Sequence, residues 1–196
     1  MKGNKGQKKI RLLYLDCDGC INKGSDNCAP DRHIYNDRFS QVVLNRDGTT
    51  CEQTYVDPEL AARVSKLITD FDLYIVASTS WRLFYTKEDF KELLTLRGLP
   101  GERLIGYTPN LMGASSWAAY TTTRADEIRA FLRDFKEPVE FCIILDDLRE
   151  AGVVGVPNIM FCKTDFDLGY TEQDDLEVRK WIEDFLKKEK NGAKSN

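Results

Sequence analysis

Histidine is nearly absent from this chain, whose 196 residues include only one, His33. With one histidine, a structural zinc site would need at least three cysteines, and in such sites the cysteines usually come in closely spaced pairs. Cys17 and Cys20 do have C-x-x-C spacing, but Cys28 and Cys51 lie further along and form no second pair of that kind. We therefore disfavour a zinc site built from these four cysteines. Because the sequence shows no export signal, we also expect free thiols rather than disulfides.

Three other features are missing, and each excludes a class of protein. No apolar run approaches the length that crosses a bilayer, and residues 1–9 lack the apolar centre of a signal peptide. We therefore expect a cytoplasmic protein with no membrane partner. The formal net charge of −4 argues against a general polyanion binder. No G-x-G-x-x-G follows the first predicted strand, which argues against a dinucleotide-dependent oxidoreductase.

The remaining composition is typical of one soluble globular domain, with 42% hydrophobic and 31% charged residues. We expect a flexible basic arm over residues 1–9, a single domain over residues 10–190 and a flexible tail over residues 191–196. The lysines of the arm are more typical of a solvated tail than of a nucleic-acid contact. The sequence does not indicate an oligomeric state.

Predicted strands and helices alternate along the chain, which indicates an α/β fold with a mostly parallel sheet. A hairpin is also predicted, from residues 41–45 and 50–56 joined through Arg46-Asp-Gly. In the last helix we expect Leu176, Ile182, Phe185 and Leu186 to pack inward. Apolar runs predict strands at residues 10–15, 73–77, 103–105, 139–145 and 158–162. Capping residues and helical spacing predict helices beginning after Asp57, Thr86, Thr123 and Thr171.

Polar side chains follow several of these strands. The first strand stops at Asp16 and Asp18, with Gly19 next. In open parallel sheets, ligands bind beyond the carboxyl ends of the strands, so polar residues at these ends should converge. The other residues expected at this edge are Ser78, Thr79, Ser80 and Arg82 after the second parallel strand, Arg124 at the start of a helix, and Asp146 and Asp147 after a later strand.

Carboxylates gathered at one edge would repel each other, and a hard divalent cation resolves this. Mg2+ suits a site with few carboxylates and a phosphate supplied by the substrate. We expect Asp16, Asp18, Asp146 and Asp147 to form the metal site, with either of the last two as the direct ligand.

Catalytic roles follow from the chemistry of phosphoryl transfer. Asp16 is the expected nucleophile, and Asp18 the acid that protonates the leaving oxygen and later activates water. Thr79, with Ser78 as an alternative, would hydrogen-bond a phosphoryl oxygen, and Arg124 would offset charge on the transferring group. Substrate contacts are expected from Gly19, Ser80 and Arg82; for Arg82 a surface ion pair is an equally good interpretation.

These residues resemble the motifs of the haloacid dehalogenase (HAD) phosphohydrolases. Asp-Cys-Asp-Gly at residues 16–19 resembles motif I (D-x-D-G), residues 75–79 resemble motif II, and residues 143–147 resemble the DD form of motif IV. The chain is similar, over residues 10–187, to the small HAD domain of Swiss Army Knife RNA repair proteins. Segments that carry this closer resemblance are Val56-Asp-Pro-Glu-Leu, Ser80-Trp-Arg, Arg97-Gly-Leu-Pro, Arg124-Ala-Asp-Glu-Ile and Lys163-Thr-Asp-Phe-Asp-Leu-Gly-Tyr-Thr.

The resemblance implies a Rossmann-like core and Mg2+-dependent phosphatase activity. In the family the first motif I aspartate is the nucleophile, and the second is the acid/base that also offers its backbone carbonyl to Mg2+. Motif III is often lysine, whereas Arg124 stands at the matching position, which keeps the charge but changes the geometry. Residues 21–56 are too short for a globular cap domain, so we interpret them as a hairpin flap.

We therefore expect a Mg2+-dependent phosphomonoester hydrolase with an aspartyl-phosphate intermediate, acting on a nucleic-acid end or a nucleotide phosphate. Two alternatives stay open. The same fold could act on a phosphoprotein or a small phosphometabolite, or it could serve as a non-catalytic binding module.

Overall fold

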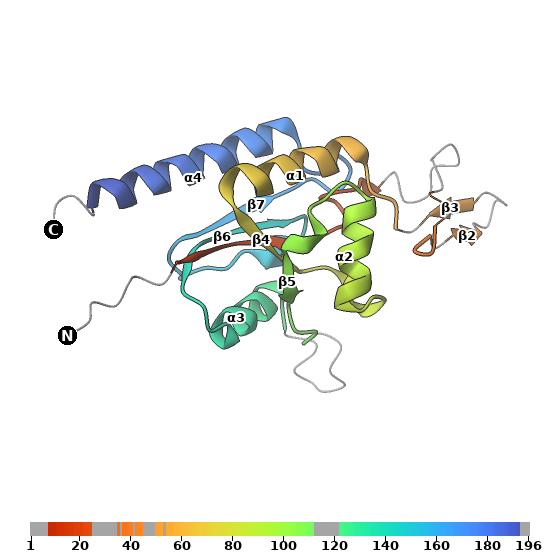
Figure 1. Cartoon of the computed structure of the whole chain (residues 1–196), viewed down its shortest axis with the longest axis horizontal. Helices are drawn as coiled ribbons and strands as arrows, with labels where there is room; N and C mark the ends of the chain where they lie inside the picture. Colours follow the sequence, from red (N-terminus) through yellow and green to blue (C-terminus); the bar gives the residue numbers. More distant parts are fainter. Residues whose placement is uncertain are drawn as a thin grey trace.

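Five parallel strands form the centre of the molecule, which we describe from a computed structural model (Figure 1). The structure describes residues 8–24, 35, 37–40, 42–44, 50–52, 54–111 and 122–192. The strands lie in the order β5-β4-β1-β6-β7. Their bounds are Ile10–Leu15 for β1, Leu73–Ala77 for β4, Leu104–Tyr107 for β5, Val139–Asp146 for β6 and Ile159–Lys163 for β7. The predicted α/β fold with a parallel, Rossmann-like sheet is confirmed.

Helices cover both faces of this sheet. Buried side chains of α1, α2 and α4 join one hydrophobic cluster, and those of α3 join the cluster on the opposite face. Figure 1 shows α1 and α4 lying together on one side of the sheet and α3 on the other. The helices are α1 Pro58–Phe71, α2 Lys87–Leu96, α3 Arg124–Asp134 and α4 Glu172–Gly192.

The sequence of β1 explains this layering. Side chains alternate along a strand, so Leu13 and Leu15 pack against one helical layer while Leu12 and Tyr14 pack against the other. All four are almost completely buried. A strand covered on both faces needs such a continuous apolar run, and the run must end where the sheet meets solvent.

The predicted hairpin is confirmed in shorter form. β2 (Val42–Leu44) pairs antiparallel with β3 (Thr50–Glu52), with Val43 opposite Cys51. Its turn and half of residues 21–56 lie outside the described residues, so the flap remains a prediction. Within this segment, the carbonyl of Phe39 accepts a hydrogen bond from the Tyr85 hydroxyl at 3.3 Å. This bond connects the segment to the residues just before α2.

Some boundaries and contacts differ from expectation. Leu176, expected in the core, is 56% exposed, and Val178 takes the inward position together with Ile182. α4 continues to Gly192, beyond residue 190 where we placed the end of the domain. Among the described residues, three short 3-10 helices were not predicted: η2 Ser80–Leu83, η3 Gly101–Arg103 and η5 Arg149–Ala151. In the part of the chain described here, no helix combines the length and apolar character needed to cross a membrane.

Candidate active site

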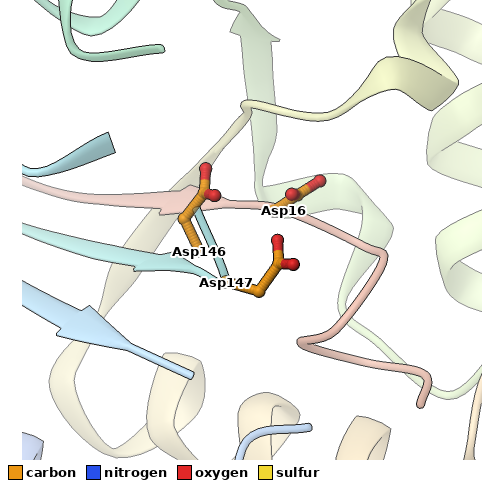
Figure 2. A group of neighbouring side chains, drawn as sticks. All are labelled: Asp16, Asp146 and Asp147. Atoms are coloured by element: carbon orange, nitrogen blue, oxygen red, sulfur yellow. The ribbon is translucent and has the colours of Figure 1, made fainter. Parts of the chain in front are cut away.

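Three aspartates meet at the carboxyl edge of the sheet. β1 and β6 are adjacent parallel strands with Leu15 opposite Leu145, so Asp16 and Asp146 leave the sheet side by side. Each of Asp16, Asp146 and Asp147 offers a carboxylate oxygen, and these oxygens lie within 4.8 Å of one another. Figure 2 shows the three side chains around a common space, from the ends of the two strands. We call these three residues the aspartate trio.

Burial makes this arrangement electrostatically unfavourable. Asp16 is 4% exposed and Asp146 is completely buried. Loss of hydration raises the pKa of Asp16 well above its usual range, and repulsion by Asp146 raises it further. Burial also raises the pKa of Asp146 to about 7, against a lowering by Arg124, and it raises the pKa of Asp147. The fold therefore holds together carboxylates that would be more stable apart.

The positively charged side chain of Arg124 lies close to these carboxylates. It is the first residue of α3, where the Thr123 hydroxyl caps the helix by accepting a hydrogen bond from Asp126 N. Its Nε lies 3.6 Å from Asp146 Oδ2, and its Nη2 lies 3.9 Å from Asp16 Oδ2. The side chain is only 6% exposed. Among the described residues, Nε and Nη1 of Arg124 and Oδ2 of Asp146 have no hydrogen-bond partner.

These unpaired groups indicate that the site is built to hold something more. Buried donors and acceptors are normally satisfied, because leaving one unpaired costs about 1–3 kcal/mol. Here the donor Arg124 Nε and the acceptor Asp146 Oδ2 lie 3.6 Å apart, an ion-pair distance that is too long for a hydrogen bond. An anion held by Arg124 and a cation held by the trio would satisfy both.

Asp18 is held apart from the trio by two hydrogen bonds. Its Oδ1 accepts from Asn22 Nδ2 at 2.9 Å, and its Oδ2 accepts from the indole Nε1 of Trp81 at 3.1 Å. The carboxylate is thereby fixed two residues after Asp16, at the partly exposed rim. The expected contribution of Asp18 to the metal site, through its backbone carbonyl, remains a prediction.

Gly19 occupies a position that no other residue would fit well. Its φ is +69°, and a Cβ here would lie 2.8 Å from Asp147 Cβ and 3.1 Å from Phe166 Cα. The glycine therefore lets the motif I turn approach Asp147 closely. Its backbone N–H donates to Asn22 Oδ1 at 3.0 Å. Direct contact of Gly19 with substrate stays a prediction.

The residues after β4 lie at the same edge of the sheet. Thr79 is buried, and its Oγ1 accepts a hydrogen bond from Trp81 N at 3.3 Å. Ser78 is also buried, and its Oγ has no partner among the described residues. Ser80 is exposed at the start of η2. The choice between Ser78 and Thr79 as the residue that contacts phosphate therefore remains open.

Arg82 has a different environment from the one expected. The ion pair that we considered for it does not lie at the surface, because the Arg82 side chain is 5% exposed and paired internally, whereas contact of Arg82 with substrate stays a prediction. Its Nη2 donates to Glu127 Oε2 at 2.7 Å, and its Nη1 donates to the Thr79 carbonyl at 2.8 Å. Arg82 thus links the residues that follow β4 to α3.

Sequence reasoning missed three residues of this site: Asn22, Trp81 as a hydrogen-bond donor, and Glu127. The three-residue spacing of Arg124 and Glu127 on one helix was an available signal, because residues so spaced share a helix face. Nothing in the sequence marks the pairing of Trp81 with Asp18, which are 63 positions apart.

The aspartate trio fits a hard divalent cation such as Mg2+. Its donors are all carboxylate oxygens, at separations that one ion can bridge, and a bound cation would offset the burial and repulsion that raise their pKa values. For the disfavoured zinc site, Cys17 and Cys20 are free and buried. The side chains of Cys28 and Cys51 lie outside the described residues, so that hypothesis is not tested.

Comparison with known proteins adds an independent finding. A search among curated proteins found no match. A family profile described as the HAD domain in Swiss Army Knife RNA repair proteins matches residues 12–174. That span runs from β1 into the first turn of α4 and includes every residue of the site above. The chain therefore belongs to the HAD superfamily, in the family of HAD domains found in Swiss Army Knife RNA repair proteins.

Proposed function

We propose that this protein is a Mg2+-dependent phosphomonoesterase that works through an aspartyl-phosphate on Asp16. The observation that carries the proposal is the buried aspartate trio facing Arg124, whose Nε and Nη1 have no hydrogen-bond partner among the described residues. A phosphate bound between Arg124 and a cation would satisfy these groups together. Membership of the HAD superfamily supports phosphoryl-transfer chemistry in general.

The first half of the reaction would transfer the phosphoryl group to the enzyme. An Asp16 carboxylate oxygen forms a bond to phosphorus as the bond from phosphorus to the leaving oxygen breaks. Asp18, in its acid form, gives its proton to that leaving oxygen, so an alcohol departs. Arg124 would hold the oxygens of the transferring group, where a fixed positive charge offsets the charge they carry.

The second half would restore the enzyme. Asp18, now a carboxylate, takes a proton from a water molecule whose oxygen bonds to phosphorus. The bond between phosphorus and Asp16 breaks, and inorganic phosphate leaves. Hydrogen bonds from Asn22 and Trp81 would keep Asp18 on the side of the leaving group in both steps.

Asp16, Asp146 and Asp147 would hold the magnesium ion. When bound, it supplies positive charge that keeps the three carboxylates ionised and lowers the repulsion between Asp16 and an incoming phosphate dianion. The backbone carbonyl of Asp18 is a further candidate ligand.

The direct test is hydrolysis of an aryl phosphate, followed with and without Mg2+ and after removal of metal with EDTA. We expect turnover only with the metal. Wild-type protein incubated with beryllofluoride and Mg2+ should also form an adduct on Asp16, detectable by 19F NMR. An absence of both turnover and adduct would leave the protein as a binding module and contradict the proposal.

We propose a phosphorylated nucleic-acid end as the substrate. Phe84 and Phe166 are two exposed aromatic side chains, 63% and 47% exposed. Phe84 directly follows η2, the element that carries Trp81, and the backbone of Phe166 lies beside Gly19. Aromatic faces of this kind can stack on bases, and such contacts contribute about 1–3 kcal/mol per base.

A substrate panel separates this proposal from its alternatives. Oligonucleotides with 3′- or 5′-phosphates, free nucleotides, phosphopeptides and small sugar phosphates would be compared by kcat/KM. We expect an oligonucleotide to be preferred, and the preference to shrink in Phe84→Ala and Phe166→Ala. A higher kcat/KM for a phosphopeptide or sugar phosphate would overturn the substrate assignment and leave the phosphatase proposal standing.

A further inference from the structure

Glu127 is a buried charge outside the aspartate trio, and it connects three parts of the structure. Its side chain is fully buried on α3, one turn after Arg124. Oε2 accepts from Arg82 Nη2 at 2.7 Å, and Oε1 accepts from the backbone N–H of Leu111 at 2.9 Å. Arg124 Nη1 lies 4.0 Å from Oε2. One carboxylate thus lies between two buried guanidinium groups, which would otherwise repel each other.

Arg82 connects Glu127 to the residues that follow β4. It belongs to η2 (Ser80–Leu83), and it also donates through Nη1 to the Thr79 carbonyl at 2.8 Å. With both terminal nitrogens used in this way, Arg82 fixes η2 against α3. Without Glu127, Arg82 would be an unpaired buried cation, and such a group moves toward water.

Trp81, the residue before Arg82, completes the connection. Its side chain is buried and its indole Nε1 donates to Asp18 Oδ2 at 3.1 Å. A shift of η2 therefore moves the donor that orients Asp18. The continuous path is Glu127 to Arg82, Arg82 to η2, and Trp81 within η2 to Asp18.

We infer that Glu127 is a positioning residue for catalysis, which holds η2 through Arg82 so that Trp81 orients the carboxylate of Asp18. This inference rests on the proposed function, in which Asp18 is the acid/base. Glu127 would act through Arg82 and Trp81 rather than by contacting the reacting groups itself. It differs from a purely structural ion pair because its loss changes the geometry at Asp18 while the fold is retained.

The test compares Glu127→Gln with a matched ion pair at the other end of the sheet. Gln keeps the volume of Glu and removes its charge. Glu140→Gln is the control, because Glu140 also pairs with an arginine, Arg11, at 2.7 Å, at the far end of β6. Arg82→Lys is the second variant, since lysine keeps the charge but cannot reach both Glu127 and the Thr79 carbonyl in the same way.

Two measurements decide the outcome. In Glu127→Gln, kcat should fall roughly 10- to 100-fold, as expected for a misplaced catalytic group, with KM within about threefold of wild type. Arg82→Lys should act similarly, and the double variant should be no worse than the more impaired single variant. In 1H–15N spectra, the indole signal of Trp81, assigned with Trp81→Phe, should shift in Glu127→Gln and stay in place in Glu140→Gln.

Each result has a distinct meaning. Unchanged kcat and an unchanged Trp81 indole signal in folded Glu127→Gln would overturn the inference, as would losses that add in the double variant. If Glu127→Gln does not fold, Arg82→Lys decides by the same two readouts. A wild-type protein without phosphatase activity would refute the proposed function instead, and the indole signal would still test the link from Glu127 to Trp81.

Discussion

Asp16 shows at the scale of one residue how a functional group can oppose stability. Its pKa is raised because it is buried beside Asp146, so the charged form that catalysis needs is disfavoured in the metal-free fold. We predict that Asp16→Asn lowers phosphatase activity at least about 1,000-fold, because an amide cannot act as the nucleophile. The same change should leave the Tm of metal-free protein equal or higher, since it removes one of the mutually repelling carboxylates.

Activity assays and calorimetry would test both parts, with the exposed Asp134→Asn as the control. A large loss of Tm in Asp16→Asn would mean that this carboxylate stabilises the fold. Near-normal activity would remove Asp16 as the nucleophile.

Gly19 gives a second prediction at this scale. Gly19 and Gly98 both have positive φ, +69° and +84°, but a Cβ at Gly98 meets nothing within 4 Å. Replacement of either glycine by alanine should lower the free energy of unfolding by about 1–2 kcal/mol, because of backbone strain. Only Gly19→Ala should also push against Asp147, and so weaken Mg2+ binding and activity. Thermal unfolding and Mg2+ titration would check this, and equal Mg2+ affinity in the two variants would contradict it.

Individual site residues were predictable to the extent that their roles depend on local sequence. Asp16, Asp146 and Asp147 follow apolar strands directly, so the rule that parallel strands end at one edge was enough to place them together. Arg82 also follows a strand, but its partner Glu127 is 45 positions away. Local sequence does not determine such a pairing, which explains why the ion pair that we considered for Arg82 was placed at the surface.

At the scale of elements, the sequence predicted the strands and helices whose core-facing residues follow a regular spacing. β4 has the predicted bounds, and α1 begins at Pro58 after the Asp57 cap, as expected. The exposure of Leu176 was not predicted, because we placed it on the inward face of α4, where Val178 lies instead. The 3-10 helices were missed because their few residues carry no periodic pattern.

Two helix caps allow a matched prediction about elements. Thr123 and Asp126 at α3 exchange reciprocal hydrogen bonds, and Thr171 and Asp174 at α4 do the same. Thr123→Ala and Thr171→Ala should each destabilise the protein by about 1 kcal/mol. Activity should fall severalfold or more only in Thr123→Ala, because Arg124 is the next residue and its guanidinium faces the trio.

Denaturant unfolding and kcat/KM, measured on both variants, would test this difference. Equal losses of activity would show that the cap acts only through global stability. Unchanged activity in Thr123→Ala would show that Arg124 keeps its place without the cap.

At the scale of the whole molecule, the order of the strands joins the parts of the site. β1 lies between β4 and β6, so the acids after β1 and β6 and the hydroxyl residues after β4 come together from three separate stretches of sequence. The sequence predicted a parallel sheet but not this order, because strand neighbours depend on the packing of the connecting helices.

Global stability should therefore depend on pH and on Mg2+ together. The folded-state pKa values of Asp16 and Asp146 lie above the unfolded value of 3.8, that of Asp146 at about 7. For such acids the folded state binds protons more tightly, so their contribution to stability is complete below the unfolded pKa and is lost as pH rises through the folded pKa. We predict that the Tm of metal-free protein falls between about pH 5 and pH 8. This fall should be smaller in Asp146→Asn.

Magnesium should oppose this fall, because it binds the carboxylates in their deprotonated form. At about 100 times its Kd, it should raise the Tm by about 5–10 °C near pH 8, and by much less near pH 5. NaCl of equal ionic strength separates binding from screening, and Asp146→Asn should lose most of the effect. A Tm increase that is equal at both pH values, or that survives in Asp146→Asn, would place the metal elsewhere and separate the aspartate trio from magnesium.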